Sequence, residues 1–241
     1  MLLRLPTSVS EASRCLSEGA IPVGGATLVW AAWQRDGFPE QAVSLRDVPE
    51  ARVIGAEEVG AAVVLNQIDE RVPEVLRRAA AGVGTGAVRR AATVGGNLVG
   101  STLRCLLPAA LVLDARAVVL DADGTYETDL AEVVAKRPLL LSLRWSAPLA
   151  CAYRKLPAKA GGEPPSVAAA AVHAGGAGGV KLLRVAVREG YEVLTETVPC
   201  GADAAGVLDA LARTQLGTLS AEVRELLREQ VAAALASAGE R

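Results

Sequence analysis

The chain has 241 residues, which is long enough for one large domain or two modest ones. Its 25 Lys and Arg against 27 Asp and Glu give a net charge of −2, which argues against a nucleic-acid binder that relies on a basic field. The single histidine, His173, leaves few routes to a Ser-His-Asp triad or a His-rich zinc site.

The first 50 residues predict a small α/β unit. Short strands are expected at residues 2–5, 20–23 and 42–45. Ser8 or Ser10 is placed to cap a helix over 11–18, and Gly19 ends it. A second helix is expected over 27–34. The alternation of strand and helix within so short a segment is typical of an α/β unit.

From residue 52 onward the alternation is lost. Strands are expected at 53–55, 117–121, 125–128 and 138–145, and helices at 72–81 and 106–113. Asp123-Gly124 is a hairpin-turn signal. Strands and helices that mix without a regular βαβ repeat predict an α+β fold.

Pro148 marks the domain boundary that we expect. Beyond it, strands are predicted at 151–156, 166–173, 181–187 and 192–197, loops at 159–165 and 175–179, and helices at 204–212 and 220–235. The last helix has an apolar residue every four positions, which gives it one apolar face. The sequence therefore predicts a domain at 1–148, with subdomains at about 1–50 and 51–148, and a C-terminal α+β domain at 149–241.

The four cysteines are scattered, without a C-x-x-C pair that would suit zinc or an iron–sulfur cluster. The N-terminus lacks the basic and apolar segments of a signal peptide. No window has the roughly 18 uninterrupted apolar residues of a membrane span. We therefore expect a cytoplasmic protein with reduced thiols, no membrane span and no nucleic-acid partner.

Two segments with paired glycines stand out. The first glycine segment is Val23-Gly24-Gly25-Ala26-Thr27-Leu28, and the second is Thr93-Val94-Gly95-Gly96-Asn97-Leu98. In each, successive backbone N–H groups can converge on an anion, and glycine allows a phosphate to approach the main chain closely. Two such segments suit a diphosphate. The chain has five Gly-Gly pairs, however, so a pair by itself also fits an ordinary turn.

The first glycine segment resembles the A-G-G-x-[STD]-L flavin-binding motif in the medium subunit of molybdenum hydroxylases, the carbon monoxide dehydrogenase and xanthine dehydrogenase family. Residues 89–98, Arg-Arg-Ala-Ala-Thr-Val-Gly-Gly-Asn-Leu, are similar to the second motif of that family, R-x-R-x-T-I-G-G-N-[LI]. Weaker resemblances follow in the family's order and cover nearly the whole chain. They lie at Gly55-Ala56, 108–115, 153–156, 166–172 and 220–224.

The resemblance implies an FAD-binding domain of the vanillyl-alcohol-oxidase (PCMH) type in two subdomains, followed by a small C-terminal α+β domain with an antiparallel sheet. It implies that FAD is held by both glycine segments, with Arg104 and Lys155 nearby. The implied cofactor-binding residues are Val23, Gly24, Gly25, Ala26, Thr27, Leu28, Thr93, Gly95, Gly96, Asn97, Leu98, Arg104 and Lys155.

The resemblance also implies the function. Electrons would enter FAD from an iron–sulfur subunit, which receives them from a molybdopterin subunit, and would leave to NAD, a quinone or oxygen. The redox chemistry would belong to the cofactor, while the protein binds and orients it. The expected partners are therefore an iron–sulfur subunit and a molybdopterin subunit of one heteromeric complex.

Some positions leave alternatives open. Where the family carries an acidic residue after the second motif, this chain has Cys105, a poor hydrogen-bond acceptor. A flavin-free homologue that serves as a structural or assembly partner is therefore the alternative function. Arg104 fits either a diphosphate contact or a solvated surface position. Lys155 fits either the flavin or ordinary packing, and Trp30 and Trp33 fit a core or an interface.

Overall fold

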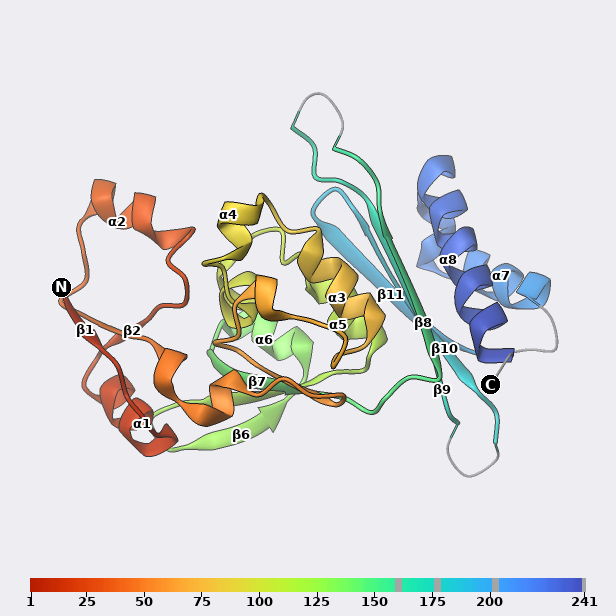
Figure 1. The fold of residues 1–241 in the computed structure, drawn as a ribbon. Helices are drawn as coiled ribbons and strands as arrows, with labels where there is room; N and C mark the ends of the chain where they lie inside the picture. Colours follow the sequence, from red (N-terminus) through yellow and green to blue (C-terminus); the bar gives the residue numbers. More distant parts are fainter. Residues whose placement is uncertain (159–161, 176–178, 201–203, 240–241) are drawn as a thin grey trace. The chain divides into compact units, whose positions relative to one another are not determined.

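The computed structural model describes residues 1–158, 162–175, 179–200 and 204–239. The chain divides into two units (Figure 1). The first unit comprises Met1–Val72, Val83–Leu106 and Ala115–Trp145, and the second comprises Pro73–Gly82, Leu107–Asp114 and Ser146–Arg241. The second unit thus includes two segments that precede Pro148 in the sequence. The loops expected at 159–165 and 175–179 lie partly outside the described residues.

The first unit begins with a parallel sheet of three strands in the order β1-β3-β2. The strands are β1 (Leu2–Arg4), β2 (Ile21–Pro22) and β3 (Gln41–Val43), and the helices between them are α1 (Val9–Ser17) and α2 (Val29–Asp36). Ser8 caps α1, because its Oγ accepts from the Glu11 N–H at 3.3 Å. Gly19 follows α1 with a φ of +84°, as a helix-ending glycine should.

An antiparallel sheet in the order β4-β7-β5-β6 forms the rest of the first unit. Its strands are β4 (Glu58–Gly60), β5 (Arg116–Leu120), β6 (Thr125–Thr128) and β7 (Leu139–Arg144). Short helical segments accompany it: η1 (Leu45–Asp47), η2 (Pro49–Arg52), η3 (Leu65–Gln67), α4 (Gly86–Arg89), the π-helical η4 (Gly96–Gly100) and α6 (Leu130–Lys136).

The structure of this region differs from the sequence-based expectation at two places. The strand expected at 53–55 is absent, and Ile54 makes only an isolated bridge to Val59. The chain turns there, because the Gly55 N–H donates to the Glu58 carbonyl at 2.9 Å, and the strand begins after the turn. The helix α6 was not predicted, although Asp129 caps it by accepting from the Glu132 N–H at 2.7 Å.

The second unit is built on an antiparallel sheet in the order β11-β10-β9-β8. The strands are β8 (Ala150–Lys155), β9 (Val167–His173), β10 (Leu182–Glu189) and β11 (Glu192–Pro199). The helices are α3 (Glu74–Ala81), α5 (Leu107–Val112), α7 (Ala204–Ala212), the short η5 (Gln215–Thr218) and α8 (Ala221–Gly239). The predicted α+β class, with an antiparallel C-terminal sheet, is confirmed.

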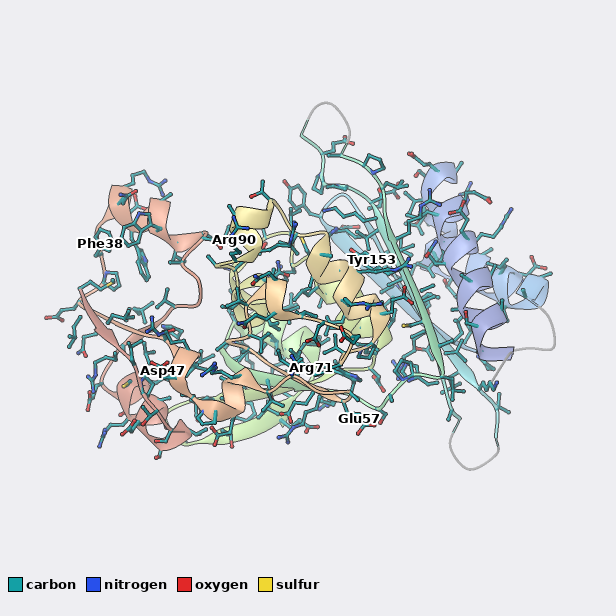
Figure 2. The ribbon with its side chains drawn as sticks, viewed as in Figure 1. Phe38, Asp47, Glu57, Arg71, Arg90 and Tyr153 are labelled. Carbon is teal, nitrogen blue, oxygen red and sulfur yellow. The ribbon has the colours of Figure 1, made fainter. Side chains whose placement is uncertain are left out.

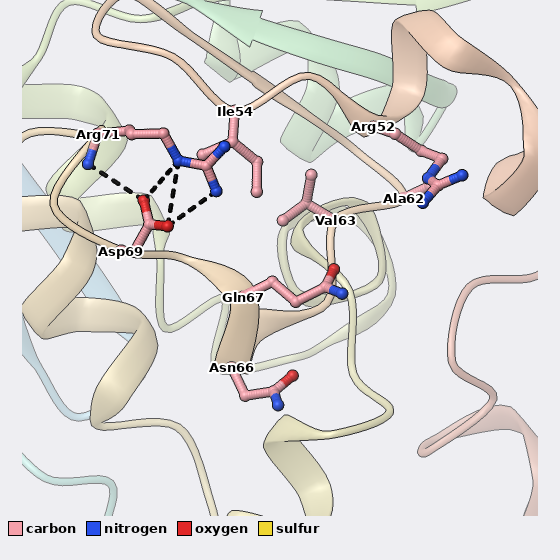
Figure 3. Close-up of a pocket in the computed structure, with 8 residues that line it drawn as sticks. All are labelled: Arg52, Ile54, Ala62, Val63, Asn66, Gln67, Asp69 and Arg71. Atoms are coloured by element: carbon pink, nitrogen blue, oxygen red, sulfur yellow. Dashed lines mark hydrogen bonds and ion pairs between the residues drawn. The ribbon is translucent and has the colours of Figure 1, made fainter.

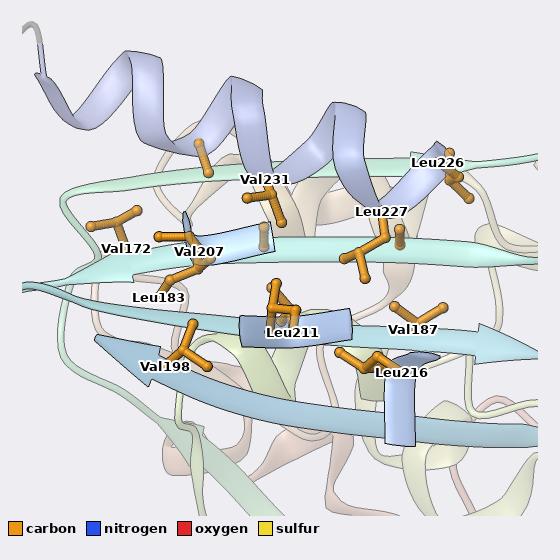
Figure 4. Packing of buried hydrophobic residues seen from close by; sticks show 14 of the residues in the cluster. Val172, Leu183, Val187, Val198, Val207, Leu211, Leu216, Leu226, Leu227 and Val231 are labelled. Atoms are coloured by element: carbon orange, nitrogen blue, oxygen red, sulfur yellow. The ribbon is translucent and has the colours of Figure 1, made fainter. Parts of the chain in front are cut away.

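Helices cover both faces of this sheet. Side chains of α7 and α8 pack on one face, as Figure 4 shows for Val207 and Leu227. Segments around α3 and α5 contact the opposite face, where His173 Nε2 lies 2.7 Å from the Val112 carbonyl. Residues Val167 to Val172 of β9 are consequently 0% exposed. His173 therefore has a structural role, because its ring nitrogen is hydrogen-bonded to the main chain.

Candidate functional site

The first glycine segment leaves β2 and leads into α2. Ala26 has a φ of +55°, a left-handed conformation that non-glycine residues rarely adopt. Its carbonyl accepts from the Trp30 N–H at 3.1 Å. Among the described residues, no acceptor lies within hydrogen-bond distance of the N–H groups of Gly24, Gly25, Ala26 and Thr27. The segment therefore presents backbone donors beside the start of a helix, which is the arrangement that binds anions.

The second glycine segment is engaged differently. The Gly95 N–H donates to the Ala61 carbonyl at 2.9 Å, and the Asn97 N–H to the Thr93 carbonyl at 2.9 Å. The Gly96 N–H donates to Thr93 Oγ1 at 3.1 Å. The segment then enters the π-helical turn η4, a geometry that is often found near functional sites. Its N–H groups thus hold the segment in place instead of pointing to a free space.

The structure brings the two glycine segments into contact within the first unit. A Cβ added to Gly24 would lie 2.5 Å from Thr93 Oγ1, and one added to Gly25 would lie 1.7 Å from the Ala91 carbonyl oxygen. Side chains at these two positions would push the segments apart. The paired glycines at 24 and 25 are therefore required by close approach to the other segment, which is a stronger reason than a turn.

Asn97 is buried, with 6% of its surface exposed. Its Oδ1 accepts a hydrogen bond from the Leu106 N–H at 2.9 Å, which links the second glycine segment to the start of the segment that leads into α5. Leu98, which follows it, is 1% exposed. Cys105 is 8% exposed, so the position where the family has an acid is also turned inward. These residues support the loop that surrounds the second glycine segment, and none of these three side chains is open to solvent.

Arg104 has a φ of +41°, and its guanidinium donates hydrogen bonds to carbonyl oxygens of the same chain. Its Nε donates to the Leu98 carbonyl at 3.1 Å and its Nη2 to the Val134 carbonyl at 3.4 Å. Burial, and then the charge of Arg137, lower the pKa of the Arg104 guanidinium. Neither of the open interpretations fits this arrangement fully, because its Nε binds Leu98 of the second glycine segment and its Nη2 binds Val134 of α6.

The remaining predicted residues divide between the units. The Val23 N–H donates to the Val43 carbonyl at 2.8 Å, and Leu28 is 54% exposed. Lys155 belongs to the second unit, where its Nζ donates to the Gly82 carbonyl at 2.7 Å. Tyr153 lies two residues before it on β8 and is 5% exposed (Figure 2). Within the second unit, Lys155 is therefore hydrogen-bonded to the end of α3 and Tyr153 is buried.

A hollow that sequence reasoning missed also lies in the first unit (Figure 3). Its volume is about 440 Å³, within the range of small-molecule sites. Its lining residues are Arg52, Ile54, Ala62, Val63, Asn66, Gln67, Asp69 and Arg71. Its wall adjoins the second glycine segment, because the Val63 carbonyl accepts from the Val94 N–H at 3.0 Å. No motif in the sequence singles out this set.

Charge in the hollow is partly neutralised. Arg71 Nη2 lies 2.8 Å from Asp69 Oδ2, and this contact holds the pKa of the Asp69 carboxyl below its usual value. Arg52 is exposed, and no charged partner for it lies among the described residues. The hollow thus combines apolar walls with amide and guanidinium donors at its rim.

Three broader features concern the described part of the chain. It contains no group of three His, Cys, Asp or Glu residues placed to hold a metal ion. Its helices include none that is both long enough and apolar enough to cross a lipid bilayer. All four cysteines are free thiols.

Residues 3–141 match the model of a protein family described as the FAD binding domain in molybdopterin dehydrogenase. No curated protein matches the sequence. Among solved structures, a chain of reconstituted CO dehydrogenase from Oligotropha carboxidovorans has a TM-score of 0.75 and 21% identity, with 98% of both chains covered.

Two other solved structures are similar over their full length. A chain of carbon monoxide dehydrogenase from Hydrogenophaga pseudoflava has a TM-score of 0.74 and 20% identity, with 98% of both chains covered. A chain of quinoline 2-oxidoreductase from Pseudomonas putida 86 has a TM-score of 0.70 and 19% identity, and the match covers 100% of this chain and 97% of that chain. At these identities the likeness shows a shared fold.

Proposed function

Because the chain belongs to the family of FAD-binding domains in molybdopterin dehydrogenases, we propose that it is the electron-transfer flavoprotein subunit of a molybdenum hydroxylase. FAD is the cofactor of this family. The family match covers more than half of the chain and includes both glycine segments. The observation that carries the proposal is the first glycine segment, whose N–H groups from Gly24 to Thr27 have no acceptor among the described residues and which is held against the second segment.

The first glycine segment fits FAD best. The N–H groups of Gly24 to Thr27 have no acceptor among the described residues, and they lie at the start of α2. These donors would hold the diphosphate, whose negative charge the helix start also favours. Gly24 and Gly25 carry no Cβ, so this segment can lie directly against Thr93 and the Ala91 carbonyl, which would hold its donors in position for the diphosphate.

The second glycine segment would act as a support. Its own N–H groups donate to Ala61 and Thr93, so they fix the position of the Thr93 side chain against Gly24. Two further hydrogen bonds hold the same loop: Arg104 donates to the Leu98 carbonyl, and Asn97 accepts from the Leu106 N–H. Thr93, Gly95, Gly96, Asn97, Leu98 and Arg104 thus enter the proposed site mainly as residues that position the first segment.

The cofactor would supply the redox chemistry, accepting electrons from an iron–sulfur subunit and passing them to NAD, a quinone or oxygen. The chain itself would bind and orient FAD. Its partners would be the iron–sulfur subunit and the molybdopterin subunit of the same complex. We place this complex in the cytoplasm, and the four free thiols support that placement.

The proposal is tested by purifying the chain under mild conditions and recording its visible absorbance, followed by titration with FAD while flavin fluorescence is measured. We expect the two bands of an oxidised flavin, or quenching that saturates at micromolar FAD. Absence of both up to high micromolar FAD would overturn the proposal and favour the flavin-free structural partner.

A pair of matched variants locates the site. Gly25→Ala should weaken FAD binding at least tenfold, because the added Cβ meets the Ala91 carbonyl oxygen and separates the two segments. Gly100→Ala is the control, since a Cβ at Gly100 meets no atom within 4 Å. Equal FAD affinity in the two variants would show that the contact between the segments does not form the site.

A further inference from the structure

The charged residues in the stretches that contain the two glycine segments are all of one sign. Residues 83–106 of the first unit contain three arginines, Arg89, Arg90 and Arg104, and no Asp or Glu. Residues 19–34, which contain the first glycine segment, include no charged residue at all. An anion bound where these stretches meet is therefore repelled by no carboxylate from either of them, and the arginines supply the full opposite charge.

Two of these three arginines are engaged within the chain. Arg104 donates to two carbonyl oxygens, as described above. Arg89 does the same, because its Nη1 donates to the Val83 carbonyl at 3.0 Å and to the Gly84 carbonyl at 2.9 Å. The guanidiniums of Arg89 and Arg104 therefore hold loops of the first unit in place.

Arg90 differs from both of them. It is exposed, and its guanidinium has neither a hydrogen-bond acceptor nor an acidic partner among the described residues. It lies close to the Arg89 guanidinium, since a Cβ added to Gly86 would lie 3.7 Å from Arg90 Nη1 and 3.9 Å from Arg89 Nη2. Two like charges near one point, without an acid from residues 83–106, raise the local positive potential.

The main chain at Arg90 leads directly into the contact between the two glycine segments. A Cβ added to Gly25 would lie 1.7 Å from the Ala91 carbonyl oxygen and 3.0 Å from the Ala92 nitrogen. Arg90 is the residue before this peptide, at the end of α4 (Figure 2), and consecutive Cα atoms are about 3.8 Å apart. Its long side chain is therefore within reach of a ligand held by the N–H groups of Gly24 to Thr27.

A diphosphate needs more than these N–H groups. Backbone donors supply hydrogen bonds and partial charge, whereas both phosphoryl groups of a diphosphate carry a full negative charge that loses water on binding. A guanidinium compensates this charge and can bind two phosphate oxygens at once. The first glycine segment itself offers no cation, so the cation has to come from the segment that touches it.

We propose that Arg90 is the residue of this chain that pairs with the diphosphate held by the first glycine segment. The inference rests on the proposed function, in which FAD supplies the diphosphate. It moves the arginine contact away from Arg104, whose nitrogens bind carbonyl oxygens of the chain, to the neighbouring cation that has no such partner among the described residues. The backbone donors would orient the diphosphate, and Arg90 would neutralise it.

The experiment measures the dissociation constants of FAD, by fluorescence quenching, and of ADP, by calorimetry, for the full chain. ADP is included because it carries a diphosphate without a flavin. We expect Arg90→Gln to weaken both ligands on the order of tenfold, the effect of losing one charge-assisted contact. Arg90→Lys keeps the charge without the paired donors, so its affinities should lie between those of the wild type and Arg90→Gln.

Two controls separate this contact from a general effect of charge or folding. Arg77→Gln makes the same substitution at an exposed arginine of α3 in the second unit, and it should keep the wild-type affinities. Raising NaCl from about 0.05 to about 0.5 M should narrow the difference between wild type and Arg90→Gln, because salt screens an exposed ion pair. Circular dichroism and urea unfolding show whether each variant is folded.

The outcomes distinguish this inference from the proposed function. Wild-type FAD affinity in folded Arg90→Gln, or an equal loss in Arg77→Gln, would overturn the role of Arg90 and leave the proposed function standing. A difference between wild type and Arg90→Gln that salt does not change would also overturn it, since the side chain would then act by packing. Failure of the wild type to bind FAD would refute the proposed function. In that case ADP binding that Arg90→Gln weakens would still support the diphosphate contact, and absence of ADP binding would overturn both.

Discussion

The two glycine segments look alike in the sequence and differ in the structure. The first is open, with backbone donors that have no acceptor among the described residues. The second is closed, because the N–H groups of Gly95, Gly96 and Asn97 donate to neighbouring atoms. The difference teaches that a paired glycine serves either to present the main chain or to let two chain segments touch. Changes in the second segment should therefore reduce stability, and changes in the first should reduce binding.

The largest effect on stability is expected for Asn97 in the second segment. Asn97→Ala removes the acceptor of the buried Leu106 N–H, which should lower the free energy of unfolding by about 1–3 kcal/mol. Urea unfolding measures this change. Asn66→Ala is a matched control, since Asn66 is the only other asparagine and is exposed. Equal stability of the two variants would contradict the structural role of Asn97.

A smaller effect is expected where the segments touch. Gly24→Ala places a Cβ 2.5 Å from Thr93 Oγ1, and Thr93→Ala removes that oxygen. The two substitutions should therefore compensate in FAD affinity, with a coupling energy of about 1 kcal/mol in a double-mutant cycle. FAD titration of the four proteins measures it. Additive effects would show that Gly24 and Thr93 do not meet.

Gly95→Ala sharpens the contrast further. Gly95 has a φ of −62° and a ψ of −44°, so its backbone suits any residue. The obstacle is Ala61, whose Cβ lies 3.0 Å from the added Cβ. We expect a loss of about 1 kcal/mol in stability from overpacking, restored by Ala61→Gly in the double variant. A loss of FAD affinity without loss of stability would contradict the supporting role of this segment.

The smallest effect concerns the helix that precedes the first glycine segment. The Thr7 N–H and hydroxyl donate to the Glu11 carboxylate at 2.8 and 3.0 Å, and they lower its pKa below the ordinary value of 4.5. A lowered pKa adds stability above pH 4.5 that is lost as the pH falls through the folded value. The stability gap between wild type and Glu11→Gln should thus shrink from pH 7 to pH 3 in urea unfolding. A constant gap would show that Glu11 does not act through its charge.

Local signals in the sequence located many elements of the fold. Ser8 and Gly19 set the ends of α1, and Asp123-Gly124 marks the turn between β5 and β6, where Gly124 has a φ of +131°. Such caps and turns depend on neighbours within a few residues, so they can be read from the chain. The prediction of a strand at 53–55 was wrong because the conformation there depends on residues farther along the chain. The Gly55 N–H binds the Glu58 carbonyl in a turn, and Gly60 packs closely against the Ala51 carbonyl.

The sequence by itself determined that two glycine segments with anion-binding character stand in the first part of the chain. Only the tertiary structure decided that Gly24 contacts Thr93 and that the Asn97 side chain binds the Leu106 N–H. It also decided that two nitrogens of Arg104 donate to carbonyl oxygens of the same chain. The physical reason is competition for hydrogen-bond partners. A backbone N–H offers the same donor in any sequence, and whether it remains available to a ligand depends on which distant acceptor the fold brings to it.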